Sequence, residues 1–111
     1  LAVGATQQSF RHSAELLQHP DAARALETMR QTLNPDVVIY DLPPMLASDD
    51  AMSFMSYVDC ALLIAAAGTT TARNLDDCER QLSELVPIAG VILYKYDLKS
   101  ESYSYYEYDY I

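Results

Sequence analysis

Three apolar runs divide the chain and predict its main strands. Residues 37–40, 60–65 and 88–93 carry almost no polar side chains, which is typical of strands covered on both faces in a parallel sheet. Residues 1–5 form a shorter apolar stretch that fits a strand entering a loop. The long runs are separated by segments whose apolar residues recur every three or four positions, so strands and helices are expected to alternate.

The segments between these runs predict helices. Pro20 suits a first helical turn, and Asn34-Pro35 ends that helix because a residue before proline avoids the α region. Residues 48–57 predict a second helix capped by Ser48 or Asp49, and residues 13–17 a brief helical turn. A third helix is expected over residues 72–85, with four residues facing inward: Leu75, Cys78, Leu82 and Leu85. This alternation predicts an α/β fold built from right-handed βαβ units on a parallel sheet.

Composition narrows the class of protein. The 111 residues allow one small domain, and a net charge of −9 argues against a nucleic-acid partner. Cys60 and Cys78 lack a metal-binding spacing, so buried reduced thiols are favoured over a disulfide, which fits a cytosolic location. No apolar run reaches 18 residues, so this segment is expected to be soluble. The start at Leu1 fits an excised piece of a longer protein.

Asp41 ends the first long apolar run and is followed by Leu42-Pro43-Pro44. Ligands of open α/β sheets gather at the carboxyl ends of strands, where a carboxylate can hold Mg²⁺ or its water shell. A loop- or helix-capping aspartate explains the same pattern equally well. The two prolines favour the metal interpretation, because they stiffen the backbone beside the carboxylate.

The loop at residues 68–71 lies between a predicted strand and a predicted helix. Its threonine hydroxyls and backbone N–H groups could meet an anion at the helix N-terminus. An ordinary N-cap is the favoured interpretation.

After about residue 96 the aliphatic residues give way to tyrosine, serine and acidic residues. Five tyrosines fall within eight positions: Tyr103, Tyr105, Tyr106, Tyr108 and Tyr110. We therefore expect residues 97–111 to be a flexible, solvated tail separate from a domain of residues 1–96. The tyrosine-rich segment has four interpretations: an edge strand, an aromatic patch for a partner, a low-complexity end, or a cluster of phosphoacceptors. In the last case the added phosphates would repel one another.

The chain resembles the bacterial tyrosine kinases of capsule and exopolysaccharide synthesis in the order of its motifs. These are the strand with Asp-x-Pro-Pro, the Gly-Thr loop, the strand Gly90-Val91-Ile92-Leu93 and the tyrosine tail. The segment Ser13-Ala14-Glu15-Leu16-Leu17 is similar to a Pro-Ser-Glu-Leu-Leu segment of that family, and Asp50-Ala51 to the Asp-Ala that follows its prolines. The resemblance covers the C-terminal half of the family's kinase domain. A GxxxxGK[ST] loop is absent from the chain.

The resemblance implies a fragment of a doubly wound, P-loop NTPase-like domain, part of an ATP-dependent protein-tyrosine autokinase that regulates polysaccharide polymerisation and export. Asp41 would be catalytic and beside Mg²⁺, Tyr94 would lie against the adenine of ATP, and the tail tyrosines would be phosphorylated between subunits of a ring. The implied partners are further copies of the chain and a membrane-embedded polysaccharide co-polymerase or activator segment. The implied location is the cytoplasmic face of the inner membrane.

Two residues depart from the family pattern. Ala66 stands where an arginine is common, and Tyr94 replaces an expected asparagine. These departures keep a second interpretation open: a non-catalytic, degenerate kinase-like module that binds the export machinery. A cell-division or partition-type ATPase is a third, although it would not explain the tyrosines.

Overall fold

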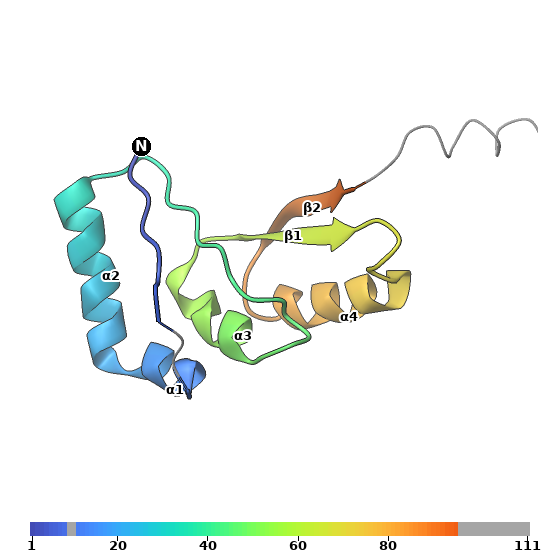
Figure 1. Cartoon of the computed structure of the whole chain (residues 1–111), viewed down its shortest axis with the longest axis horizontal. Coiled ribbons are helices and arrows are strands. Elements are labelled where there is room, and N and C mark those ends of the chain that lie inside the picture. The colour runs from blue at the N-terminus through green and yellow to red at the C-terminus, as the bar shows by residue number, and fades with distance from the viewer. Residues whose placement is uncertain (9–10, 96–111) are drawn as a thin grey trace, which may run out of the picture. The chain divides into compact units, whose positions relative to one another are not determined.

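A computed structural model describes residues 1–8 and 11–95, which form a mixed α/β structure (Figure 1). It divides into two compact units, Leu1–Asp59 and a second unit that begins at Cys60. Two parallel strands with their helices confirm the predicted α/β class. The larger doubly wound P-loop arrangement and the boundary at residue 96 stay predictions.

The second unit is a single strand–helix–strand motif. It consists of β1 (Ala61–Ala66), α4 (Ala72–Ser83) and β2 (Ile88–Tyr94). The strands are parallel and in register from Leu62 opposite Gly90 to Ala66 opposite Tyr94, with an irregularity between Ala61 and Leu62. Two predicted strands and the helix between them are therefore confirmed, with bounds shifted by one or two residues.

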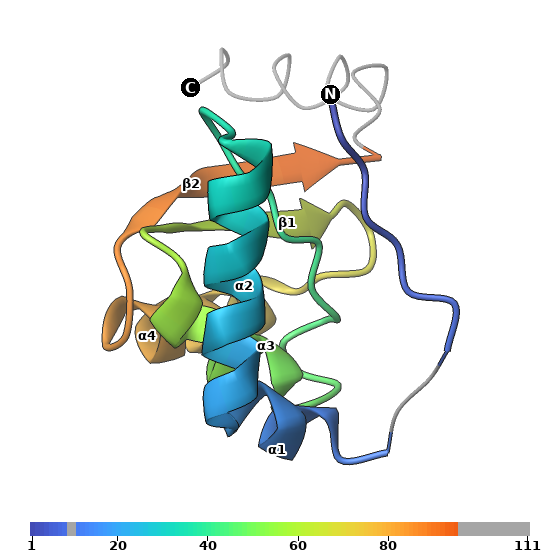
Figure 2. The same ribbon diagram turned by 90° about the vertical axis from the view of Figure 1, so that its left-hand side faces the viewer.

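Within the second unit only one face of β1 is covered, and residues 91–94 of β2 are 45–52% exposed on both faces. Helix α4 runs along the strands (Figure 1), whose arrowheads point the same way in Figure 2. It brings Cys78 and Leu82 into a small core with Ala65, Ala66 and Val86. Side chains of the other face are exposed, by 52% at Leu62 and 64% at Ile64. The prediction that these strands are covered on both faces is therefore wrong, because one helix can shield only one side of a sheet.

Two residues of this unit also depart from prediction. Leu85 is 54% exposed rather than inward-facing, because α4 ends at Ser83 and the helical periodicity ends with it. Cys60 is exposed, whereas Cys78 is buried, and both are free thiols. Burial, followed by the charge of neighbouring Asp77, raises the pKa of the Cys78 thiol above its ordinary value of 9.0.

The first unit is helical. It contains α1 (Ser13–Gln18), α2 (Pro20–Leu33), α3 (Asp50–Phe54) and the 3-10 helix η1 (Met55–Tyr57), which confirm the three predicted helical segments. Helix α2 begins at the predicted proline and ends at Asn34, which adopts a left-handed backbone with φ 43°. Asn tolerates that conformation better than most residues, and Pro35 prevents the helix from continuing.

The predicted side-chain cap of α3 does not form. Asp49 occupies the N-cap position, but its carboxylate accepts no capping hydrogen bond, because its backbone is helical (φ −80°, ψ −1°) rather than extended. Ser48 Oγ is buried and has no hydrogen-bond partner among the described residues. The helix is instead stabilised by burial of Ala51 and Phe54.

The strands predicted at residues 37–40 and 1–5 are also not formed. Both segments are irregular, and apolar side chains in them are exposed, by 75% at Val37 and 88% at Ile39. A strand is defined by hydrogen bonds to a neighbouring strand, and the described part of the first unit contains no strand. The apolar run alone could not supply that partner.

Candidate functional site

Asp41 lies in the irregular segment between α2 and α3, not at the end of a strand. Its side chain is exposed, and within the described part of the chain it takes part in no hydrogen bond or ion pair. This argues against the alternative interpretation as a capping aspartate, since a cap requires its carboxylate to accept a backbone N–H. The structure thus places Asp41 as an available carboxylate on the surface of the first unit.

The backbone before Asp41 is anchored by aromatic packing. The Tyr40 ring meets the buried Phe54 ring edge-on, with centroids 4.8 Å apart, and Phe54 in turn contacts Tyr57 at 5.3 Å. Such edge-to-face pairs add about 0.5–1.5 kcal/mol to the burial of the rings. Pro43 and Pro44 follow after one intervening residue, Leu42, so Asp41 lies between an anchored ring and a nearby stiff dipeptide.

The described residues do not complete a magnesium site around Asp41. Across residues 1–8 and 11–95, no three His, Cys, Asp or Glu side chains gather closely enough to hold a metal ion. Magnesium usually takes only one or two protein carboxylates and fills its remaining positions with water and phosphate oxygens. Asp41 is therefore chemically suited to supply one carboxylate ligand, and a magnesium site at this residue stays a prediction.

A second carboxylate of the first unit is structural. The hydroxyl of Ser13, the first residue of α1, donates to Asp50, with Oγ 2.8 Å from Oδ1 and 2.7 Å from Oδ2. This contact joins α1 to α3 across 37 positions of sequence. The sequence indicated Asp50 only as part of the Asp-Ala pair shared with the kinase family. It did not indicate Ser13 as the partner of Asp50, because no local pattern links residues so far apart.

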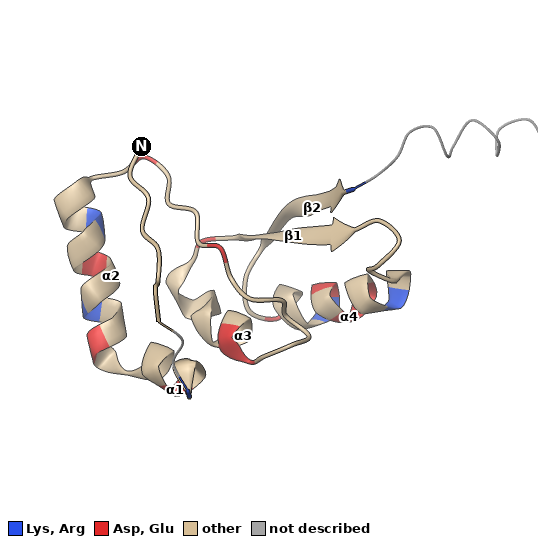
Figure 3. Cartoon of the chain, in the orientation of Figure 1, with Lys and Arg blue, Asp and Glu red and all other residues tan. Residues whose placement is uncertain are grey.

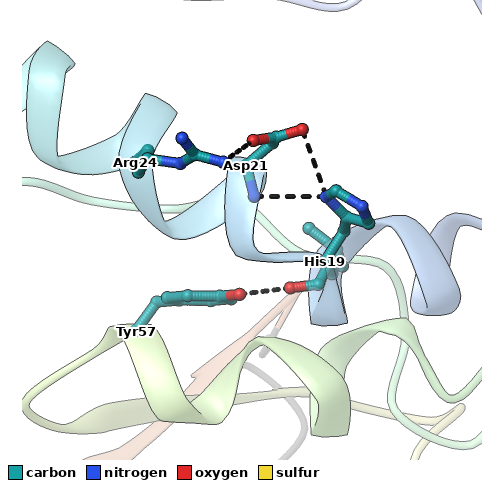
Figure 4. A network of polar contacts seen from close by, with 5 residues as sticks. His19, Asp21, Arg24 and Tyr57 are labelled. Atoms are coloured by element: carbon teal, nitrogen blue, oxygen red, sulfur yellow. Dashed lines mark hydrogen bonds and ion pairs between the residues drawn. The ribbon is translucent and has the colours of Figure 1, made fainter.

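A polar cluster fixes the start of α2 (Figure 4). His19 is the N-cap, and its Nδ1 accepts the backbone N–H of Asp21 at 3.2 Å, while the Arg24 guanidinium pairs with the Asp21 carboxylate. The hydroxyl of Tyr57 donates to the backbone carbonyl of Leu17 at the end of α1. His19 is exposed and caps a helix, a role that the sequence did not indicate.

Tyr94 and Ala66, the two departures from the family pattern, occupy paired positions at the ends of β2 and β1. Ala66 is buried, whereas Tyr94 is 45% exposed and has the Lys95 ammonium 5.2 Å from its ring centroid. The Tyr94 ring is thus accessible and already carries a cation–π contact. Ala66 and Tyr94 are therefore neighbours at the strand ends, and contact of Tyr94 with adenine stays a prediction.

The loop at residues 68–71 is a helix cap. Thr71 Oγ1 accepts the backbone N–H of Asn74 at 3.1 Å, and Thr70 Oγ1 accepts that of Ala66 at 2.9 Å. Both hydroxyls therefore already accept backbone hydrogen bonds, which confirms the favoured N-cap interpretation. Thr70 additionally closes the turn after β1, a role that sequence reasoning missed.

The five predicted phosphoacceptors, Tyr103, Tyr105, Tyr106, Tyr108 and Tyr110, lie outside the described residues. Among the helices that are described, none has the length and apolar character required to cross a membrane.

Comparison with known proteins relates part of the chain to a bacterial protein. Over 81 residues, the chain is 38% identical to a Klebsiella pneumoniae protein named "Putative tyrosine-protein kinase in cps region". The match covers 72% of this chain but 11% of that protein, so the chain spans a small part of its relative. No family model and no solved structure matches the chain. The resemblance predicted from the motifs is confirmed at this level: the chain is a distant relative of a tyrosine-protein kinase of the capsule region.

Proposed function

We propose that this chain is part of an ATP-dependent protein-tyrosine autokinase that regulates capsular or exopolysaccharide polymerisation and export. The 38% identity to a capsule-region tyrosine kinase carries the proposal. The Asp-x-Pro-Pro motif at Asp41 and the terminal tyrosine cluster support it independently. The longer protein would bind ATP and Mg²⁺, form a ring of identical subunits and contact a membrane-embedded activator segment.

Within this proposal the residues of the chain have two tasks. Asp41 supplies one carboxylate ligand to Mg²⁺. Its exposure, and the absence of a bonded partner among residues 1–8 and 11–95, leave both oxygens available. The hydroxyl oxygen of a tail tyrosine from a neighbouring subunit would form a bond to the γ-phosphorus of ATP as the bond to the β–γ bridging oxygen breaks. ADP would leave, and the phenolic proton would pass to solvent. Each phosphate adds close to two negative charges to a segment that already contains Glu101, Glu107 and Asp109. Mutual repulsion would weaken docking of the tail and loosen the ring.

The test uses the longer protein incubated with Mg-ATP and analysed by mass spectrometry. We expect several phosphates on residues 103–110 and a loss of at least tenfold in Asp41→Asn. Asp49→Asn is the matched control, because Asp49 is also exposed and its carboxylate makes no capping bond. An unmodified tail in the unaltered protein, or equal activity in Asp41→Asn and the unaltered protein, would contradict the proposal.

A non-catalytic, kinase-like regulatory module is the second candidate. The observation that favours it is the pairing of Ala66 with Tyr94, since both strand ends depart from the kinase pattern at neighbouring positions. A titration of the longer protein with Mg-ATP separates the candidates: the kinase proposal requires binding, whereas absence of binding together with retained binding to the export machinery supports the module.

A further inference from the structure

A small cavity lies within the first unit, and its lining includes Tyr40 but not the neighbouring Asp41. It has a volume of about 290 Å³, and α2 lines one side of it through Leu26, Glu27 and Arg30. The opposite side includes Tyr40, Tyr57 and Asp59. None of these six residues was singled out as a site residue in the sequence.

The size of the cavity restricts what can occupy it. Ligand pockets for drug-sized molecules run from about 300 to 1,000 Å³, so a volume of about 290 Å³ lies at the lower limit of that range. It is too small for a nucleoside triphosphate but sufficient for one long side chain. The cavity is therefore not a substitute for the absent phosphate-binding loop.

The aromatic side of the cavity is held in place from behind. Tyr40 and Tyr57 both pack against the buried Phe54, at centroid distances of 4.8 and 5.3 Å. The Tyr57 hydroxyl is also fixed by its hydrogen bond to the carbonyl of Leu17 (Figure 4). Because these rings are already ordered, binding of an occupant carries little entropic cost for fixing the side chains of the cavity.

The charges of the cavity favour a cation. Glu27 and Asp59 supply two carboxylates against the single guanidinium of Arg30, whereas α2 as a whole carries residues of both signs (Figure 3). Arg30 Nη1 lies 3.6 Å from Glu27 Oε2 in a pair whose side chains are 65% and 55% exposed, so the pair is weak and easily opened. Asp59 makes no hydrogen bond or ion pair within the described part of the chain.

We propose that this cavity receives the side chain of an arginine presented by another polypeptide. The planar guanidinium can stack on a tyrosine ring and donate to a carboxylate at the same time, which an ammonium group does less well. The chain's net charge of −9 also attracts a basic segment. An anion would be attracted by Arg30 alone and repelled by the two carboxylates, Glu27 and Asp59. The proposal stands independently of kinase activity.

The test is an NMR titration of the isotopically labelled 111-residue chain with acetyl-arginine amide. We expect saturable shifts at Leu26, Tyr57 and Asp59, with a Kd of about 1–10 mM for so small a probe. Acetyl-citrulline amide has nearly the same shape without the charge and should bind at least fivefold more weakly. Equal binding of the citrulline probe, or shifts that do not saturate, would overturn the proposal.

Two further measurements distinguish a specific arginine site from bulk charge attraction and from anion binding. Asp59→Asn should weaken arginine binding about fivefold, while Asp36→Asn, which removes an exposed carboxylate outside the cavity, should leave it unchanged. Equal weakening by both variants would mean that bulk charge alone is responsible, and would refute a specific site. Saturable shifts with inorganic phosphate in place of arginine would assign the cavity to anions and refute it as well.

Discussion

Two glycines of the second unit should respond to alanine in opposite directions. Gly90 lies inside β2 opposite Leu62, and a methyl group added there would sit 3.8 Å from Leu62 Cδ1, an ordinary van der Waals contact. Its backbone is not in the left-handed region, so alanine fits without strain. Alanine has fewer backbone conformations than glycine in the unfolded chain. Gly90→Ala should therefore raise the free energy of unfolding by about 0.4–1 kcal/mol.

Gly68 gives the opposite case. Its φ is 76°, in the left-handed region, and an added Cβ would have no heavy atom within 4 Å. The cost of Gly68→Ala is therefore purely a backbone cost of about 1–2 kcal/mol, partly offset by the same unfolded-state gain, which leaves a loss of about 1 kcal/mol. The two variants should differ by about 1.5 kcal/mol.

Equilibrium urea unfolding followed by circular dichroism measures this difference. With a slope of about 1–2 kcal/mol per molar urea, the midpoints of the two variants should be separated by about 1 M, with slopes unchanged. Destabilisation by Gly90→Ala would refute the reasoning in an informative way. It would mean that the exposed face bearing Leu62 is covered in solution, so that the extra methyl group overpacks it.

Three further predictions concern the Ser13–Asp50 hydrogen bond and the two thiols. Ser13→Ala should lower the free energy of unfolding by about 1–2 kcal/mol, because it leaves the half-buried Asp50 carboxylate without its donor, whereas Ser13→Thr should retain most of the stability in the same urea assay. Iodoacetamide at pH 8 should label exposed Cys60 much faster than buried Cys78, as mass spectrometry of the peptides would show. Because the folded-state pKa of Cys78 is raised, its contribution to stability is complete below pH 9.0 and should decline as the pH rises above that value; in Cys78→Ser this decline should be smaller.

Local signals in the sequence predicted the local parts of the fold. Pro20 and Asn34-Pro35 bound α2, and Thr71 caps α4, because proline geometry and capping act within one helical turn. The order strand, helix, strand in the second unit followed from periodicity and predicted its parallel pairing. These features require no knowledge of distant residues.

Features that depend on distant partners were not predictable. Residues 37–40 have the composition of a buried strand, yet whether a strand forms depends on a neighbour that the composition cannot identify. The Ser13–Asp50 bridge joins two short helices through a contact with no sequence pattern. The exposed faces of β1 and β2 likewise reflect how many helices cover the sheet, which is a property of the assembly rather than of either strand.

Asp41 and Asp50, two of the carboxylates that follow the apolar run, illustrate how the structure separates the roles of residues of one type. Asp50 is half-buried, and both its oxygens accept from Ser13, so its charge is already used to join α1 to α3. Asp41 is exposed and accepts no hydrogen bond from the part of the chain that the structure describes, although Tyr40 anchors the backbone just before it. A carboxylate that contributes to the fold is expected to have partners in the fold, since burial without them is costly. Asp41 has none among the described residues, and loss of its charge should therefore change function without changing stability, whereas loss of the Asp50 bridge should do the reverse.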